Sequence, residues 1–252
     1  MFRVCVVTDT GADVDKRVTE AWARIEAGLS RVLPASLRQL NAPAAVQAID
    51  AVEAALALPL PQNFRASLRT HNGTKRGYDD SGQLQPSPVP LEYLYDTNEI
   101  IEMTRMWRNN YHPEPDWDDP QVWAHLVDEE MLWLNGPVRP IIGSPGAVVV
   151  GDMNGDVQWL LDFDPAPGGT PGQVVRVDVE CVSWDVLAPS WTQLLVRYAD
   201  DLDLFAADPD SSPLVITHPG AGPACEWGST PSDSWGVRPA WLQDVQARSP
   251  YP

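Results

Sequence analysis

Residues 155–175 read GDVQWLLDFDPAPGGTPGQVV and alternate strand-forming side chains with turn residues at short spacing. Valine, tryptophan and leucine favour extended structure, whereas the Pro/Gly-rich middle of the stretch favours a turn. Asn154-Gly155, at its start, is typical of a two-residue hairpin turn and implies a strand on the N-terminal side. The region therefore predicts consecutive, mostly antiparallel strands over residues 147–151, 157–163, 173–179 and 182–187.

Apolar residues at steps of three and four predict helices on both sides of these strands. Val18, Trp22, Ile25 and Leu29 mark one face of a helix over residues 14–32. Other helices are expected over residues 44–58, 63–71, 97–107 and 122–134, and after a capping Ser190. Helices, then a strand meander, then a helix predict an α+β fold with helices packed on one face of a mostly antiparallel sheet.

The charge of the chain is large and unevenly distributed. Of 252 residues 44% are hydrophobic and 21% are charged, which is typical of a globular protein. The net charge is −18, and residues 111–210 hold 3 Lys/Arg and 19 Asp/Glu. Such a field repels nucleic acid and anionic membranes and attracts basic proteins or cations. A basic protein is therefore the expected partner, although solubility alone also accounts for an acidic surface.

Cysteine usage and hydropathy bear on the compartment. Cys5, Cys181 and Cys225 are far apart and odd in number, so neither a disulfide framework nor a zinc spacing is expected. This usage suits a reducing compartment. The first residues lack the long apolar core of a signal peptide, and no apolar run approaches membrane-spanning length. We expect a cytoplasmic protein.

Motifs for catalysis or metal binding are weak. The chain has no G-x-S-x-G, no P-loop and no histidine pair at metal-ligand spacing. The stretch Asp152-Met-Asn154-Gly-Asp156 resembles the start of a calcium loop, but Gly155 comes one position early and no glutamate closes the loop. The hairpin explains the same residues without a metal. We predict a protein with no catalytic residues and no cofactor or metal.

Asp162 and Asp164 leave an alternative open. Two carboxylates two residues apart in a strand point to the same face and can share a proton or hold magnesium. The structural interpretation is that both lie at a strand end and accept hydrogen bonds from turn N–H groups before Pro165. The sequence favours the structural interpretation, and a metal-dependent enzyme that uses this pair stays as an alternative.

Two blocks of the chain, residues 54–73 and 155–175, resemble the SUKH superfamily, in the Smi/Knr-like branch. Members carry a helix, a Leu-Pro and a short helix that ends in Asn-Gly, and later Gly-Asp, a strand, Asp-x-x-Pro and Gly-Gln-Val. The resemblance spans residues 44–205, so residues 1–43 and 206–252 are expected to be extensions of one globular unit. The matched residues are expected to be structural: Pro61, Asn72, Gly73, Gly155, Asp162, Asp164, Pro165, Gly172 and Gln173.

The resemblance implies a binding protein. Bacterial members are similar to immunity proteins, which neutralise a toxin or effector by covering its active site, and the acidity of this chain suits a basic, nuclease-type toxin domain. An alternative is a regulatory scaffold that binds endogenous proteins, as the yeast relative does. The predicted partner-binding residues are Glu114, Asp116, Asp118, Asp119, Asp128, Glu129 and Glu130, with Asp152 and Asp156 as second choice.

Overall fold

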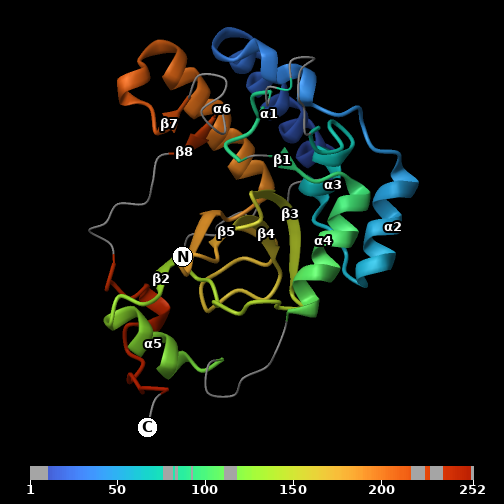
Figure 1. The fold of residues 1–252 in the computed structure, drawn as a ribbon. Coiled ribbons are helices and arrows are strands. Elements are labelled where there is room, and N and C mark those ends of the chain that lie inside the picture. The colour runs from blue at the N-terminus through green and yellow to red at the C-terminus, as the bar shows by residue number, and fades with distance from the viewer. Residues whose placement is uncertain are drawn as a thin grey trace, which may run out of the picture.

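The computed structural model describes residues 11–75, 82, 85–91, 93–110, 118–216, 225–227 and 235–250. Its strands are β1 (Tyr93–Leu94), β2 (Trp133–Asn135), β3 (Ala147–Met153), β4 (Val157–Asp162), β5 (Gln173–Asp178), β6 (Ser183–Ala188), β7 (Leu214–Val215) and β8 (Glu226–Trp227). A six-stranded sheet in the order β1-β3-β4-β5-β6-β2 forms the centre of the molecule (Figure 1), and β7 pairs with β8 separately. In the six-stranded sheet, only β2 and β6 pair in parallel. The predicted α+β class and mostly antiparallel sheet are confirmed.

The predicted strand meander corresponds to β3, β4, β5 and β6. Asn154 and Gly155 have φ angles of 55° and 83°. The N–H of Asp156 donates to the carbonyl of Met153 at 3.2 Å and closes the turn between β3 and β4. Asparagine and glycine tolerate this left-handed backbone at low cost, so the residue pair selects the hairpin.

The helices follow the predicted apolar periods closely. The structure describes α1 (Gly11–Val32), α2 (Val46–Leu56), α3 (Gln62–Leu68), α4 (Thr97–Asn109), α5 (Pro120–Asp128) and α6 (Trp191–Ala207), with short 3-10 turns η1 (Pro34–Gln39), η2 (Pro209–Ser211) and η4 (Ala240–Leu242). Ser190 caps α6 as predicted, because its hydroxyl accepts a hydrogen bond from the N–H of Gln193 at 3.3 Å. Residues 18, 22, 25 and 29 of α1 are buried, as their spacing predicts.

Helices contact both faces of the sheet, whereas the sequence predicted one. Trp159 and Trp184 project from opposite faces, because their cross-strand partners are consecutive residues of β5. Trp191 of α6 packs edge-on against Trp159 with ring centroids 6.5 Å apart. Trp107 of α4 packs against Trp184 at 6.2 Å. The tryptophans therefore join one helical layer to each face of the sheet.

The expected helix over residues 122–134 is shorter than predicted. Helix α5 ends at Asp128, and Glu130 takes a φ of 56°, which ends the helical path. The N–H groups of Met131 and Leu132 both turn back to the carbonyl of Leu126, at 2.8 and 3.1 Å. The chain then enters β2, and the parallel pairing of β2 with β6 replaces the helical hydrogen bonds that local sequence favours.

The N-terminal helix α1 packs on α3 and α6. Trp22 donates from its indole nitrogen to Ser67 of α3 at 2.9 Å, and Arg24 forms ion pairs with Asp200 and Asp203 of α6 at 2.7 and 2.8 Å. The division into segments 1–43, 44–205 and 206–252 stays a prediction. Within the described residues, none of the helices combines the length and hydropathy needed to cross a membrane.

The start of α4 at Thr97 agrees with the predicted helix and supports a test. The carboxylate of Asp96 accepts from the N–H groups of Asn98 and Glu99 at 2.8 and 2.9 Å and caps the helix. Glu99 accepts in return from the N–H of Asp96 at 2.9 Å, which completes a capping box.

Asp96→Ala should lower the free energy of unfolding by about 1 kcal/mol, because two helix N–H groups lose their acceptor. Urea denaturation measures the change. Glu102→Ala, an exposed position on the same helix, is the control and should change stability by less than about 0.5 kcal/mol. Equal effects of the two substitutions would contradict the assignment of the cap.

Candidate partner-binding surface

A buried amide connects the family-motif residues at one end of the sheet. The side chain of Gln173, which is 1% exposed, donates to the carbonyl of Pro137 at 2.9 Å and to the carboxylate of Asp162 at 3.0 Å. Its own oxygen accepts from the N–H of Thr170 at 3.2 Å. The other carboxylate oxygen of Asp162 accepts from the N–H of Asp164 at 2.9 Å. These bonds tie the end of β4, the start of β5 and the loop before β3 together.

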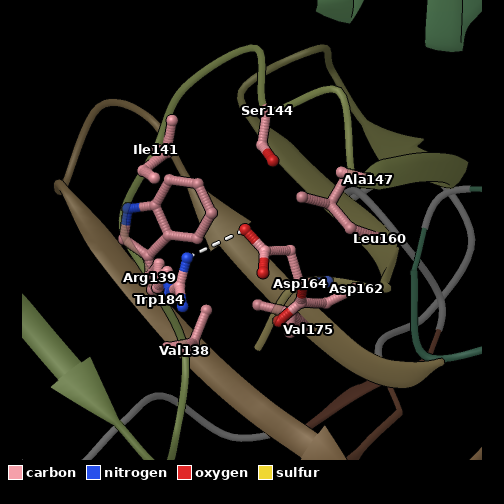
Figure 2. A pocket seen from close by; sticks show the side chains of 10 residues that line it. All are labelled: Val138, Arg139, Ile141, Ser144, Ala147, Leu160, Asp162, Asp164, Val175 and Trp184. Carbon is pink, nitrogen blue, oxygen red and sulfur yellow. Dashed lines mark hydrogen bonds and ion pairs between the residues drawn. The ribbon is translucent and has the colours of Figure 1, made fainter. Parts of the chain in front are cut away.

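The carboxylates of Asp162 and Asp164 make separate contacts within this turn. Figure 2 shows Asp164 directed to Arg139, with which it forms an ion pair at 2.9 Å. Burial raises the pKa of Asp162 to about 6, against the opposing effect of the hydrogen bonds from Asp164 and Gln173. The structural interpretation of the pair is therefore the one that the geometry favours. In the part of the chain that the structure describes, no group of three His, Cys, Asp or Glu side chains is placed to hold a metal.

The other motif residues also have structural contacts. Pro61 precedes the first residue of α3, and Gly172 packs against it with a φ of 86°. Asn72 accepts from the N–H of Thr97 at 3.0 Å and so fixes the start of α4. Gly73 has a φ of 70°, and a side chain there would lie 2.5 Å from the backbone of residue 95. Position by position, the motif holds loops and helix ends in place.

Two of the predicted partner-binding residues form ion pairs within the chain. Asp119 accepts from the N–H of Gln121 and from Arg248, and these contacts lower its pKa. Asp128 accepts two hydrogen bonds from the guanidinium of Arg238, which lowers its pKa as well. Both arginines lie in the C-terminal segment, over 100 residues away. They hold residues 235–250 against α5 and leave these carboxylates less available to a partner.

Two C-terminal tryptophans, Trp227 and Trp241, also pack against other parts of the chain. Trp241 packs edge-on against Trp123 of α5 at 6.0 Å and donates to the carbonyl of Gly136 at 3.0 Å. Trp227 stacks on Trp159 with ring centroids 5.7 Å apart. In Figure 1 the red C-terminal segment lies beside α5, and β8 lies beside α6. Trp227 and Trp241 therefore contribute to the packing of the fold.

Four other predicted positions remain, two of them described by the structure. Asp152 is 3% exposed and lies beside Tyr95, so it does not belong to the exposed acidic surface. A carboxyl group that is buried in this way is not available to a partner at the surface. Asp156 is half-buried in the β3–β4 turn. Glu114 and Asp116 lie outside the described residues.

The remaining predicted acids lie near a pocket at the opposite end of β5 from Gln173. Asp118 lines this pocket, and exposed Glu129 and Glu130 lie in the turn between two further lining residues, Leu126 and Leu132. The carbonyl of Asp156 accepts from the N–H of the lining residue at position 179 at 2.9 Å. Of these four predicted acids, Asp118 lines the pocket itself, and the other three lie on adjoining segments. Sequence reasoning missed exposed Glu180, which lies in the β5–β6 turn at the same place.

The pocket itself is apolar and has a volume of about 290 Å³. Among the described residues, its lining is mainly hydrophobic and includes no lysine or arginine. The lining residues are Asn110, Asp118, Trp123, Leu126, Leu132, Pro140, Ile142, Asp178, Val179, Val182 and Trp184. We call the pocket, together with Asp118, Glu129, Glu130, Asp156 and Glu180, the acidic pocket surface.

A larger groove of about 590 Å³ lies on the sheet face that carries Trp159. Its floor has mixed charge: Arg176 contacts Asp178 at 3.4 Å, and Asp185 accepts from Asn135 at 2.6 Å. Burial raises the pKa of Asp185. Because arginines and carboxylates alternate here, the groove is less suited to a basic partner than the acidic pocket surface is.

The comparison with protein families gives a clear result. Residues 43–197, more than half of the chain, match the SMI1 / KNR4 family (SUKH-1). The chain belongs to the SMI1/KNR4 family. The matched range includes the buried Gln173 amide and every residue of the acidic pocket surface. The resemblance seen in the sequence is thus confirmed.

Three curated fungal proteins are similar to the chain. The "Cell wall biosynthesis/cell cycle regulator smi1" of Schizosaccharomyces pombe is 26% identical over 82% of this chain and 41% of its own length. The "Glucan synthesis regulatory protein" of Neurospora crassa is 23% identical over 82% and 42%, and the "Cell wall assembly regulator SMI1" of Saccharomyces cerevisiae is 22% identical over 73% and 40%. The chain spans about two-fifths of the length of these SMI1/KNR4 relatives.

The pKa of Asp162 leads to a pH-dependent stability. Because burial raises its pKa from 3.8 to about 6 in the folded state, the protonated carboxyl favours folding. This contribution is fully present below pH 4 and is lost as the pH rises to about 6. Its size is at most about 3 kcal/mol, from two pKa units at about 1.4 kcal/mol each.

Asp162→Asn should remove this pH dependence. The unfolding free energy of wild type minus that of the variant should fall between pH 4 and 6 and stay constant above pH 7, as measured by urea titration. Taking the difference cancels other titrating groups that both proteins share. A difference that does not change with pH would contradict the raised pKa.

Proposed function

We propose that the chain is a non-catalytic module that binds a basic protein on the acidic pocket surface. The observation that carries the proposal is an apolar pocket whose described lining includes Asp118 and Asp178 but no lysine or arginine. Exposed Glu129, Glu130 and Glu180 lie in the turns that carry other lining residues. Opposite electrostatic fields speed the encounter of two proteins, and a desolvated apolar centre slows their dissociation. Membership of the SMI1/KNR4 family supports a protein-binding role.

The first form of this function is that of an immunity protein. In this form the partner is a toxin or effector, with a basic active site of the nuclease type, and the acidic pocket surface covers that site. The net charge of −18 favours this form, because an enzyme that acts on a phosphate backbone presents a positive surface. The chain then acts in the cytoplasm, where such a toxin would do damage.

The second form is that of a regulatory scaffold for endogenous proteins. It is favoured by the descriptions of the three fungal relatives, each of which is called a regulator. The two forms share the binding surface and differ in the partner. An immunity protein binds one toxic partner tightly, whereas a scaffold binds several partners that are harmless when expressed alone.

The double substitution Glu129→Lys with Glu130→Lys tests the surface. The probe is the protein encoded by the adjacent gene, and its association with the chain is measured by stopped-flow at low and high salt. At low salt the association rate should fall about tenfold, and the loss should shrink at high salt. Glu102→Lys with Asp210→Lys changes the net charge equally at exposed positions outside this surface and is the matched control. Equal losses for both variants would contradict a localised surface.

Expression of the adjacent protein separates the two forms. For an immunity protein, the adjacent protein alone arrests growth, co-expression of the chain restores growth, and the Glu129/Glu130 variant restores it less. Absence of toxicity would contradict the immunity form. The scaffold form would then predict several partners that co-purify with the wild-type chain and are lost together with the same variant.

A further inference from the structure

Three exposed aliphatic side chains line the acidic pocket surface, and others lie elsewhere on the chain. Ile142, Val179 and Val182 line the pocket and are 42%, 40% and 46% exposed. They come from two different loops, the one before β3 and the β5–β6 turn. Met131, in the α5–β2 turn, is 50% exposed. Single exposed aliphatic residues are ordinary, but a set of them around a pocket is typical of an interaction site.

The floor of the pocket is buried. Trp123, Leu126, Leu132 and Trp184 are each less than 9% exposed and belong to α5, the α5–β2 turn and β6. A volume of about 290 Å³ lies at the lower end of the range for ligand sites. The pocket therefore matches one side chain of a partner better than an organic cofactor.

Val182 has an unusual backbone. Its φ of 49° lies in the left-handed region, which β-branched residues rarely adopt. The conformation is held by β2, where the N–H of Trp133 donates to the carbonyl of Val182 at 3.1 Å. Backbone strain of this kind persists only where the surroundings enforce it, and it is often found at functional sites. Here it presents an aliphatic side chain at the edge of the pocket where glycine would fold more easily.

We propose that this pocket receives one aliphatic or aromatic anchor residue of a partner segment, and that lysine or arginine residues on both sides of the anchor face the surrounding carboxylates. The charge of the surface selects the basic flanks, and the shape and apolar floor select the anchor. This inference rests on the proposed function, because it gives the chemistry of the segment that the acidic pocket surface binds. It adds the requirement that the partner segment carries an apolar anchor residue, which attraction by charge alone does not demand.

Blocked pentapeptides supply the probes: two lysines, a central residue and two further lysines, with leucine, phenylalanine or alanine at the centre. A peptide with leucine between four glutamates is the charge control. Dissociation constants are measured from the amide NMR shifts of Val179 and Val182. The leucine and phenylalanine peptides should bind about tenfold more tightly than the alanine peptide, because only they bury an apolar side chain. The glutamate peptide should show no binding.

Val179→Asp separates the anchor from the charge. It adds a negative charge to the surface, so attraction by charge alone predicts equal or tighter binding of every lysine peptide. The anchor pocket predicts that the leucine peptide loses its tenfold preference and binds like the alanine peptide. Val46→Asp makes the same substitution at an exposed position at the start of α2 and should leave the preference unchanged.

Val182→Gly is a second variant of the pocket, chosen because it should not impair folding. Glycine accepts the positive φ, so this variant should be at least as stable as wild type and should still lose about half or more of the preference for leucine. Trp117→Ala tests the chain's own residues 111–117 as occupant, since they connect the lining residues Asn110 and Asp118. A preference for leucine that emerges only in the Trp117→Ala variant would overturn a partner anchor.

The outcomes separate the inference from the function on which it rests. Equal binding of the leucine and alanine peptides, unchanged by Val179→Asp, would overturn the anchor and leave the acidic binding surface standing. A leucine preference that is the same with lysine and glutamate flanks would support the pocket but contradict a basic partner. Failure of every peptide to bind at millimolar concentration would overturn the anchor as well as the proposed surface.

Discussion

The amide of Gln173 is the interaction on which the other parts of the sheet and its loops depend. It is buried, and it forms hydrogen bonds with the carbonyl of Pro137, the N–H of Thr170 and one oxygen of Asp162 at once. An unsatisfied polar group in this location costs more than the net gain of any one bond. One relative arrangement of the three bonded segments is therefore favoured, because it satisfies all of these groups together. These hydrogen bonds help to fix the register of β4 and β5.

The same amide positions the acidic pocket surface at a distance. Strand β5 begins at Gln173 and ends at Asp178, so it links the buried amide at one end to the pocket at the other. The loop held by Pro137 continues to Pro140 and Ile142, which form one wall of the pocket. A motif of structural residues would therefore support the proposed binding surface without belonging to it. Structural roles for the SMI1/KNR4 motif residues are thus compatible with the proposed binding of a partner.

The sequence predicted those parts of the fold that depend on interactions between residues close together in the chain. The periods of three and four in α1 and the Asn154-Gly155 turn each depend on residues within one turn of chain, and both are confirmed. The end of α5 was missed, because Trp133 leaves the helical path to pair with β6, fifty residues later. Helix contacts on both faces were missed for the same reason, since only the sheet register shows that Trp159 and Trp184 point in opposite directions.

The candidate site was predictable in composition but not in arrangement. Acidity between residues 111 and 210 is visible in the sequence, yet nothing local reveals that Asp152 is buried or that Asp128 pairs with Arg238 over a separation of 110 residues. The apolar part of the surface was missed because Val179 and Val182 lie at the ends of strands, where valine is ordinary.

The C-terminal extension has a specific consequence for the surface. Arg238 and Arg248 lie beyond the range that matches the family, yet they form ion pairs inside it, with Asp128 at the end of α5 and with Asp119, the N-cap of α5. The ion pairs fasten both ends of α5, and Glu129 and Glu130 are left as exposed charges in the turn that follows. The extension thus reduces the number of unpaired carboxylates near α5, and a smaller charged rim remains beside the apolar pocket. A partner recognised by such a surface must match its shape as well as its charge, and discrimination against other basic proteins follows from that double requirement.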